Sequence, residues 1–368
     1  EKEEREAELK KLPASYAVGQ LRERRKAIKA GTLAPVPVPF PELAKVLDGG
    51  LWPGVHGLVG PTGTGKTQWA LQVLLAAAKA QHPAHYIALE LGHDETAARL
   101  VSIQTAERET GVGFGAINRW NGDTVPDGTP ADRTGRALDE TTAGRVLAAE
   151  EVVEGLGDYL TIDCADALGG FSAKVELEAF AERAKTKGGK TPIAVLDFLQ
   201  LVRDPNDPKV DIRLAMTAAA YQARNVARKT GMVVLLVMST ARSNYAHATS
   251  LDGDKFTDPT ETKEGKRKSA EHLVGLGKES GDIEYSLSTL IAFVRGPKVQ
   301  HANRDRTLID IGVAKDREGP GGWSSVTFAG AAHEEIGARS RDVALAPFKG
   351  KGKQPSTRTA PEVDFNVE

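Results

Sequence analysis

The stretch GPTGTGKT, residues 60–67, points most directly to the fold of this chain. It satisfies the pattern G-x-x-x-x-G-K-[ST] at every specified position and lies between an apolar run and an apolar helical pattern. Its glycines allow a tight loop whose amide groups converge on phosphate oxygens, next to the positive end of the following helix. Lys66 then reaches the β and γ phosphates, and Thr67 ligands Mg²⁺ through its hydroxyl. We therefore expect a nucleotide-binding loop, with a chance glycine-rich turn as the alternative.

The expected nucleotide contacts come from nine consecutive residues. They are Gly60, Pro61, Thr62, Gly63, Thr64, Gly65, Lys66, Thr67 and Gln68. The cofactors that these residues imply are ATP and Mg²⁺.

Composition sets broad limits on the protein. With 368 residues, 40% of them apolar, the chain has room for one large α/β domain with extensions or for two small domains. Its formal charge of −2, from 48 basic and 50 acidic residues, means that any nucleic-acid contact must come from local patches. The single cysteine, Cys164, cannot form an internal disulfide, and no apolar run suggests a membrane span or a signal peptide. We therefore expect a protein of the reducing cytoplasm without a membrane partner.

Three regions follow one another along the chain. Residues 1–39 are dense in charge and end in a proline-rich connector, so they predict a helical linker or oligomerisation segment. Residues 40–335 predict the folded domain. Residues 336–368 predict a flexible C-terminal tail.

Within the folded domain, apolar β-rich runs alternate with helical patterns. The runs cover residues 55–60, 85–91, 159–163, 192–202, 232–238, 290–294 and 308–314, and the helical patterns cover 68–80, 94–109, 172–186 and 214–230. Strands that are apolar nearly throughout, with helices between them, indicate an α/β fold with a mostly parallel central sheet flanked by helices. Ligands of such sheets bind at the carboxyl ends of the strands, where residues 60–67 lie.

Two carboxylates follow apolar strands in a way that suits this loop. Asp197 ends the run IAVLD, and a carboxylate at that strand tip holds Mg²⁺ through water. Glu90 ends the run HYIALE, from which it would orient and deprotonate the attacking water. Without the loop, Glu90 would be only a surface glutamate.

The order of these motifs resembles the RecA-like motor domain of DnaB-type replicative helicases. Six segments carry the resemblance over most of residues 40–330: LDGGLWPGVHGLVGPTGTGKTQWALQ, YIALELGHDETAARL, IAVLDFLQLV, ARNVARKTGMVVLLVMSTAR, SGDIEYSLSTLIAFVR and IGVAKDREGPGG. Any one of them is a weak signal, but six in the same order are specific. The implied fold is a RecA-like P-loop NTPase core.

The resemblance assigns roles to matching positions. Glu90 would be the catalytic carboxylate and Asp197 the metal-associated one. Lys315 and Arg317 would enter the neighbouring subunit's site, where positive charge stabilises the phosphoryl-transfer transition state. The alternative for these two residues is a solvated basic turn after a strand.

The chain also departs from the family. Where the family usually carries Gln in its sensor strand, this sequence has MSTAR, so Ser239 or Thr240 stands there with a shorter reach. The family's larger N-terminal domain, which builds a collar and meets primase, has no counterpart in these residues. The charged segment 1–30 looks like the linker helix that packs on the adjacent subunit.

Contacts with single-stranded DNA are expected from loops after the two strands that end at Asp197 and at the sensor. The candidates are basic residues of residues 203–213 and 243–282: Arg203, Lys209, Arg213, Lys255, Lys266, Arg267 and Lys268. The second loop contains about as many acidic residues, so a flexible solvated loop is the alternative.

The resemblance thus implies a ring-forming DNA helicase, with six subunits expected, that hydrolyses ATP at subunit interfaces and moves on single-stranded DNA during replication. Its setting would be the cytoplasm, in association with the nucleoid, and its partners a primase or helicase loader. A RecA-like recombination or signalling ATPase that does not unwind DNA is the main alternative. A helicase-derived subunit of a plasmid or phage is a third.

Overall fold

The protein is described by a computed structural model that covers residues 13–107, 111–129, 136–164, 172–187, 189–202, 211–240, 248–249, 251–252, 255–256, 258–262, 266–276, 281–301, 304–317, 319 and 321–349. In these residues one large sheet has the strand order β13-β12-β11-β10-β1-β7-β6-β2-β5. The strands are β1 (Gly54–Gly60), β2 (Ala84–Ala88), β5 (Leu160–Cys164), β6 (Ile193–Asp197), β7 (Val233–Ser239), β10 (Thr289–His301), β11 (Arg304–Asp316), β12 (Gly322–Phe328) and β13 (His333–Ile336). Two short pairs lie apart from it, β3 (Thr124–Val125) with β4 (Leu138–Asp139) and β8 (Leu251–Asp252) with β9 (Lys255–Phe256).

The sheet is parallel from β10 to β5 and antiparallel from β10 to β13. The predicted α/β class with a mostly parallel central sheet is therefore confirmed. All seven apolar runs became strands, although β2 ends at Ala88. The last backbone bond beyond it runs from Leu89 N–H to the Asp197 carbonyl at 2.7 Å, so Glu90 lies past the strand and is exposed.

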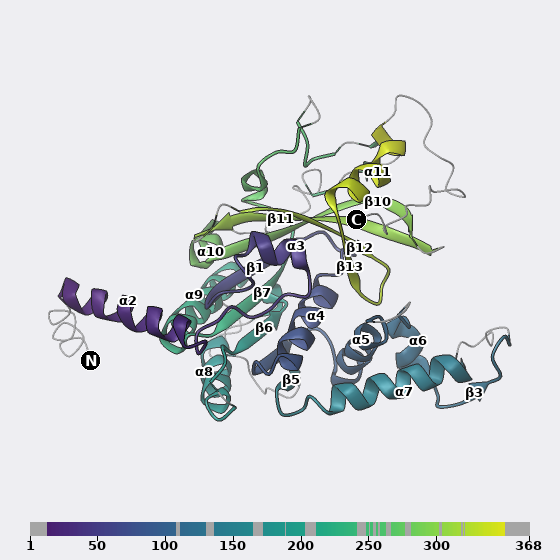
Figure 1. The fold of residues 1–368 in the computed structure, drawn as a ribbon, viewed down its shortest axis with the longest axis horizontal. Coiled ribbons are helices and arrows are strands. Elements are labelled where there is room, and N and C mark those ends of the chain that lie inside the picture. The colour runs from purple at the N-terminus through teal and green to yellow at the C-terminus, as the bar shows by residue number, and fades with distance from the viewer. Residues whose placement is uncertain are drawn as a thin grey trace.

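Helices cover both faces of the sheet (Figure 1). They are α2 (Ala14–Lys29), α3 (Pro41–Val46), α4 (Lys66–Lys79), α5 (His93–Thr105), α6 (Phe114–Arg119), α7 (Glu140–Glu154), α8 (Ala173–Ala184), α9 (Ile212–Thr230), α10 (Gly281–Ser286) and α11 (Ala338–Lys349), with 3-10 helices at Leu199–Leu201 and Ala270–Leu273. One apolar core joins α3, α4 and α5 to one face, and a second joins α8 and α9 to the other. A third, smaller core lies among α5, α6 and α7.

Helix ends follow local chemistry. The Asp139 carboxylate accepts the Thr142 N–H at 2.9 Å and caps α7. Gly231 ends α9 in the left-handed conformation, with φ 71°. The first residue of α4 follows Gly65, whose φ of 74° turns the chain from the loop into the helix.

Helix α2 stands out from the body of the molecule (Figure 1). It contains no buried residue, and it exposes Tyr16, Val18, Leu21 and Ile28. A helix of this length is marginal in water unless its apolar side packs on something. The described part of the chain supplies no such surface to it, which agrees with the predicted linker helix without testing its role.

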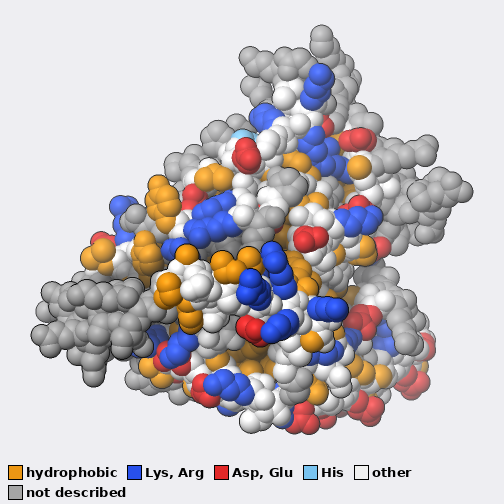
Figure 2. Space-filling model, turned by 60° about the vertical axis from the view of Figure 1, so that its left-hand side comes forward, with side chains coloured by type: hydrophobic (Ala, Val, Ile, Leu, Met, Phe, Trp, Pro, Cys, Tyr) orange, Lys and Arg blue, Asp and Glu red, His pale blue; other side chains and the backbone are white. Residues whose placement is uncertain are grey.

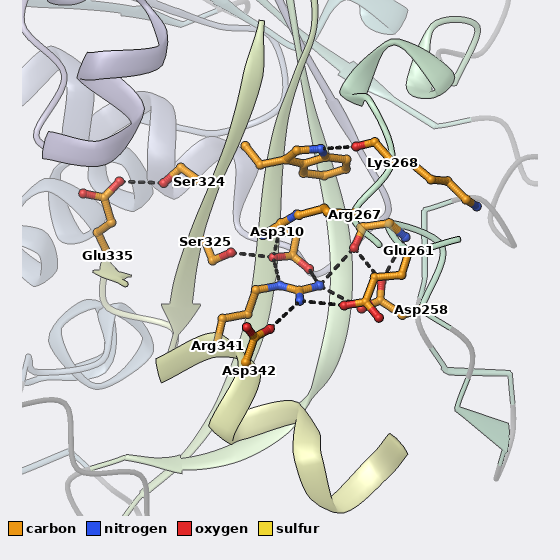
Figure 3. Close-up of polar contacts among 12 residues, drawn as sticks. Asp258, Glu261, Arg267, Lys268, Asp310, Ser324, Ser325, Glu335, Arg341 and Asp342 are labelled. Atoms are coloured by element: carbon orange, nitrogen blue, oxygen red, sulfur yellow. Dashed lines mark hydrogen bonds and ion pairs between the residues drawn. The ribbon is translucent and has the colours of Figure 1, made fainter. Parts of the chain in front are cut away.

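The predicted tail is wrong over its first part, because residues 338–349 form α11 and pack on the sheet. Arg341 is 1% exposed, and its guanidinium donates to both oxygens of Asp310 on β11, at 2.7 and 2.8 Å. It also donates to Asp258 at 2.8 Å and to Glu261 at 3.3 Å (Figure 3). The same network holds part of the segment 243–282, which the sequence predicted to be irregular. Residues far apart in sequence create this environment, so local composition could not reveal it.

Candidate active site

The loop at residues 60–67 lies at the carboxyl end of β1, as predicted. Gly63 and Gly65 have φ of 78° and 74°, a conformation that glycine adopts at little cost. The packing is close as well, since a Cβ on Gly65 would lie 2.7 Å from both His333 Cε1 and Phe328 Cζ. The loop therefore needs glycine at position 65 for two independent reasons.

A pocket of about 460 Å³ opens above this loop. It gathers residues from the loop, from the ends of β2, β6 and β7, from α5 and α6, and from the β12–β13 hairpin. Its lining comprises Thr62, Gly63, Gly65, Lys66, Thr67, Gln68, Glu90, Leu91, Arg99, Phe114, Asp197, Phe198, Val237, Met238, Ser239, Phe328 and Gly330. Glu90, Asp197 and Ser239, predicted from three separate segments, thus border the same space as the loop.

The loop lysine is held inside the pocket by backbone oxygens. Its ammonium donates to the carbonyls of Gly60 at 2.7 Å and Pro61 at 3.0 Å. Burial lowers the pKa of Lys66 to about 8, against the charges of Asp197 and Glu90, which favour the protonated form. A buried ammonium with only neutral carbonyl partners is a ready binding group for phosphate oxygens.

Asp197 is 4% exposed and lies beside the loop threonine. Burial raises its pKa, whereas hydrogen bonds from the hydroxyls of Thr67 and Tyr86 and the charge of Lys66 favour the ionised form. A hydroxyl and a carboxylate side by side are oxygen donors of the kind that Mg²⁺ takes when it bridges a protein and a nucleotide. No cluster of three or more His, Cys, Asp or Glu side chains suited to a metal occurs among the described residues.

The sensor positions differ from each other. Ser239 is half-buried and lines the pocket. Thr240 is buried, its N–H donates to the Gly60 carbonyl at 3.3 Å, and its hydroxyl has no hydrogen-bond partner among the described residues. Of the two, Ser239 is therefore the residue that borders the pocket.

Lys315 and Arg317 lie far from this pocket. Thr289 of β10 pairs both with His56, near the start of β1, and with Asp316, so the two basic residues belong to the opposite end of the sheet. Gly60 lies four positions beyond His56 along β1, which is about 13 Å at ~3.3 Å per residue.

Carbonyls at the end of α10 hold both cations. Lys315 Nζ donates to the Glu284 carbonyl, and Arg317 donates to the Tyr285 carbonyl at 2.6 Å. Burial lowers the pKa of Lys315, and the charge of Arg317 adds to this shift. Neither residue lines the pocket of its own chain; Lys315 is half-buried, whereas Arg317 is exposed and accessible to another molecule.

The predicted DNA-binding residues are scattered. Arg203 and Lys209 lie outside the described residues, Lys255 is in β9, and Arg213 and Lys266 are exposed. The Arg267 guanidinium pairs with Asp310 at 2.8 Å and lies 4.6 Å from the centre of the Trp323 ring. Lys268 donates to the Pro259 carbonyl at 3.0 Å. Exposure therefore favours Arg213 and Lys266 over Arg267 as contacts for a polyanion.

Sequence reasoning missed the residues that reach the pocket from the far side. His333 is buried and its Nε2–H donates to the Thr64 carbonyl at 2.9 Å, while its ring stacks on Phe328 at 4.4 Å. Burial lowers the pKa of His333 to about 4. Arg99 lies over the Phe114 ring at 3.9 Å. No local pattern marks these residues, because only the return of the β12–β13 hairpin and of α5 and α6 brings them to the loop.

Comparison with known proteins agrees with this geometry. No family profile matches the chain. The chain is 22% identical over 301 residues to the replicative DNA helicase DnaC of Bacillus subtilis (strain 168), a match that covers 82% of this chain and 56% of that protein. The chain therefore spans only about half the length of this curated relative.

Two solved structures share the fold. The first is a DnaB-like replicative helicase studied with its interactions with primase, at a TM-score of 0.61 and 18% identity, covering 85% of this chain and 65% of that one. The second is an ATPase domain, at a TM-score of 0.63 and 17% identity, covering 88% of this chain and 99% of that one. The predicted resemblance is thus confirmed, and the fold is that of RecA-like helicase ATPase domains.

Proposed function

From a chain with the RecA-like ATPase fold of DnaB-like replicative helicases, we propose a ring-forming ATPase that moves on single-stranded DNA. One observation carries the proposal. The pocket contains a loop lysine, a metal-type carboxylate and a candidate base, whereas the cations Lys315 and Arg317 lie at the other end of the same sheet. If Lys315 and Arg317 supply charge to the transition state, a second copy must bring them to the pocket, and head-to-tail repetition of that contact gives a ring when the rotation between copies closes.

Each pocket residue has a distinct task in hydrolysis. Lys66 leaves the Gly60 and Pro61 carbonyls and contacts the β and γ phosphates. Thr67 and Asp197 would hold Mg²⁺, which when bound would neutralise charge on the phosphates. Glu90, exposed at the pocket rim, accepts a proton from the attacking water. Arg317 of the neighbouring copy stabilises the charge that develops on the transferred phosphoryl group.

The surface offers a contact for assembly. A pocket of about 340 Å³ lies among α5, α6 and α7, with apolar walls that include Val101 and Val153 and a rim that includes Asp94, Glu150 and Glu154. Burial raises the pKa of Glu150, and the charge of Glu154 adds to the shift, so a basic partner would relieve this repulsion.

Helix α2 has complementary chemistry. It carries Arg22, Arg24, Arg25, Lys26 and Lys29 beside its exposed apolar residues. Figure 2, which brings forward the side from which α2 projects, shows lysine and arginine side chains interleaved with hydrophobic ones. We therefore place α2 of one copy in the α5–α7 pocket of the next, which adds a second contact to the same interface.

DNA would pass through the ring in contact with exposed basic residues, among them Arg213 and Lys266. Affinity then arises from phosphate contacts and falls steeply with salt, whatever the sequence of the strand. None of the helices in the described part of the chain has the length and apolar character needed to cross a membrane. The proposed setting is the nucleoid in the cytoplasm, and the proposed partners are a primase or helicase loader.

The first experiment measures ATP turnover by the purified protein with and without single-stranded DNA, with assembly state read by native mass spectrometry. A ring of about six copies whose turnover rises with DNA and is lost in Glu90→Gln supports the proposal. A monomer or open filament whose turnover ignores DNA contradicts it.

A mixing experiment tests the role of Arg317 across the interface. Arg317→Ala and Glu90→Gln should each be nearly inactive and should each still bind nucleotide. In a random one-to-one mixture, about a quarter of interfaces pair an intact Glu90 with an intact Arg317 from the next copy. Recovery of activity on mixing therefore supports a trans role, and an inactive mixture of assembled rings refutes it.

The shorter side chain at the sensor favours one alternative, a RecA-like recombination or signalling ATPase. Ser239 borders the pocket, at a position where the resemblance implies a longer glutamine side chain, so its coupling to DNA loops would differ. Strand displacement on a forked duplex separates the two functions. A protein that binds ATP and single-stranded DNA in this assay without unwinding belongs to the alternative class.

A further inference from the structure

Tyr86 lies beneath the metal-type carboxylate. It sits in β2, where it pairs in register with Val195 of β6, and two residues further along Ala88 pairs with Asp197. Its side chain is 0% exposed, and its hydroxyl donates to Asp197 Oδ2 at 2.8 Å. The tyrosine thus reaches along the neighbouring strand to the carboxylate from the side opposite the loop.

The carboxylate depends on few donors. Asp197 is almost fully buried, and a buried carboxylate stays charged only where hydrogen bonds and positive charge replace water. The Thr67 hydroxyl belongs to the phosphate loop and is needed by the metal, and the Lys66 ammonium is needed by the phosphates. The Tyr86 hydroxyl has no such role with metal or nucleotide, so its hydrogen bond to Asp197 can persist when a nucleotide binds.

We propose that Tyr86 is a positioning residue for the divalent cation: its hydroxyl fixes Asp197 Oδ2 and turns the other carboxylate oxygen toward Thr67 and the metal. This inference rests on the proposed ATPase function and adds a residue to its metal site. A carboxylate held at one oxygen cannot rotate freely about its terminal torsion, so it loses less conformational entropy when the cation binds. Partners that orient metal ligands in this way typically change metal affinity by about tenfold or more when removed.

The alternative is that Tyr86 is only a core residue whose hydroxyl needed a partner. Its ring packs in the core beneath α4, so this alternative predicts lower stability without any specific effect on the metal. Tyr86→Phe separates the two, because it removes the hydroxyl and keeps the ring. Tyr159→Phe is the matched control, since Tyr159 packs against the same core away from the pocket.

The test measures Mn²⁺ binding to the ADP-loaded full chain, from the electron paramagnetic resonance signal of free Mn²⁺. Tyr86→Phe should weaken Mn²⁺ by about tenfold while binding of ADP without metal is unchanged, and Tyr159→Phe should bind like the wild type. In turnover, the half-saturating Mg²⁺ concentration should rise while kcat at saturating Mg²⁺ is retained, a split that general loss of structure would not produce.

The possible results distinguish this inference from the proposed ATPase function on which it rests. Wild-type Mn²⁺ affinity in Tyr86→Phe overturns the inference even if hydrolysis is impaired. A loss of kcat that excess Mg²⁺ does not restore overturns it as well. Failure of the wild-type protein to bind ADP or Mn²⁺ at all would instead overturn the proposed ATPase function.

Discussion

Replacing Arg341 by Met should destabilise the fold far more than loss of a surface charge. The guanidinium is 1% exposed and donates to Asp310, Asp258 and Glu261, so its removal leaves buried carboxylates with fewer partners (Figure 3). Breaking a buried ion pair on one side costs about 3–5 kcal/mol. At about 2–4 °C per kcal/mol for a domain of this size range, Tm should fall by roughly 6–20 °C.

The pH dependence follows from Asp310. Burial alone would raise its pKa, but hydrogen bonds from Arg341 and the charges of Arg267 and Arg341 hold it below its usual range. A carboxyl with a lowered native pKa stabilises the fold above its unfolded value of about 3.9, and this contribution is lost as pH falls through the native value. The stability difference between wild type and Arg341→Met should therefore be full above about pH 4 and should shrink as pH falls below about 4.

The assay is thermal unfolding followed by circular dichroism from about pH 2 to 7. Asp342→Asn is the control, since that side chain is 68% exposed and its contact to Arg341 is 3.4 Å, and it should change stability by about 0.5 kcal/mol or less. The double variant Arg341→Met/Asp310→Asn should lose at least about 1 kcal/mol less than the sum of the single variants. A loss below about 1 kcal/mol in Arg341→Met, or additive single variants, would refute the buried network as a stabilising unit.

Three further predictions concern the nucleotide loop and the interface. Burial lowers the pKa of Lys66 to about 8, so its ammonium loses its proton above that pH, and nucleotide affinity should fall by up to about tenfold per pH unit. A fluorescent-ADP titration measures this, and an affinity that stays constant up to about pH 9.5 would contradict it. Gly65→Ala should lower nucleotide affinity by more than about tenfold and reduce the free energy of unfolding by ~1–3 kcal/mol, because alanine would have to adopt φ 74° with its Cβ 2.7 Å from His333. Gly144→Ala is the control: it lies in α7 with open space around its Cβ position, so it should not lower stability. Arg25→Glu/Lys29→Glu in α2 should dissociate the assembly, as read by native mass spectrometry. Adding Glu150→Lys and Glu154→Lys at the rim of the α5–α7 pocket should restore it, and dissociation without this restoration would refute the proposed docking pocket.

Much of the site was readable from the sequence because each part is local. The loop at residues 60–67 needs its glycines, lysine and threonine at fixed spacing, and Asp197 directly follows a buried strand. Parallel strands place their carboxyl ends at one edge, so three segments predicted separately meet there. The positions of Glu90, Asp197 and Ser239 around one pocket follow from that rule.

Local patterns failed where an element is stabilised by contacts from elsewhere. Helix α11 fell within the predicted tail, yet Arg341 is buried by partners that lie up to 83 positions away in the chain. Strands β12 and β13 contain serine, threonine and glutamate in place of a long apolar run. Only β13 lies at the edge of the sheet, and the buried hydroxyls of Ser324 and Ser325 on β12 donate to Glu335 and Asp310, partners from other segments. Helix α7 has only a narrow buried face and packs mainly on α5.

The sequence by itself determined the fold class, the phosphate loop and the carboxylates that face it, since these depend on residue spacing and on strand direction. The tertiary structure alone decided that Lys315 and Arg317 lie at the opposite end of the sheet from their own pocket, because pairing of β10 with both β1 and β11 sets that register. It alone brought Tyr86 to Asp197 and His333 to the loop. Those contacts depend on how segments far apart in the sequence pack together, and the spacing of residues along the chain does not specify that packing.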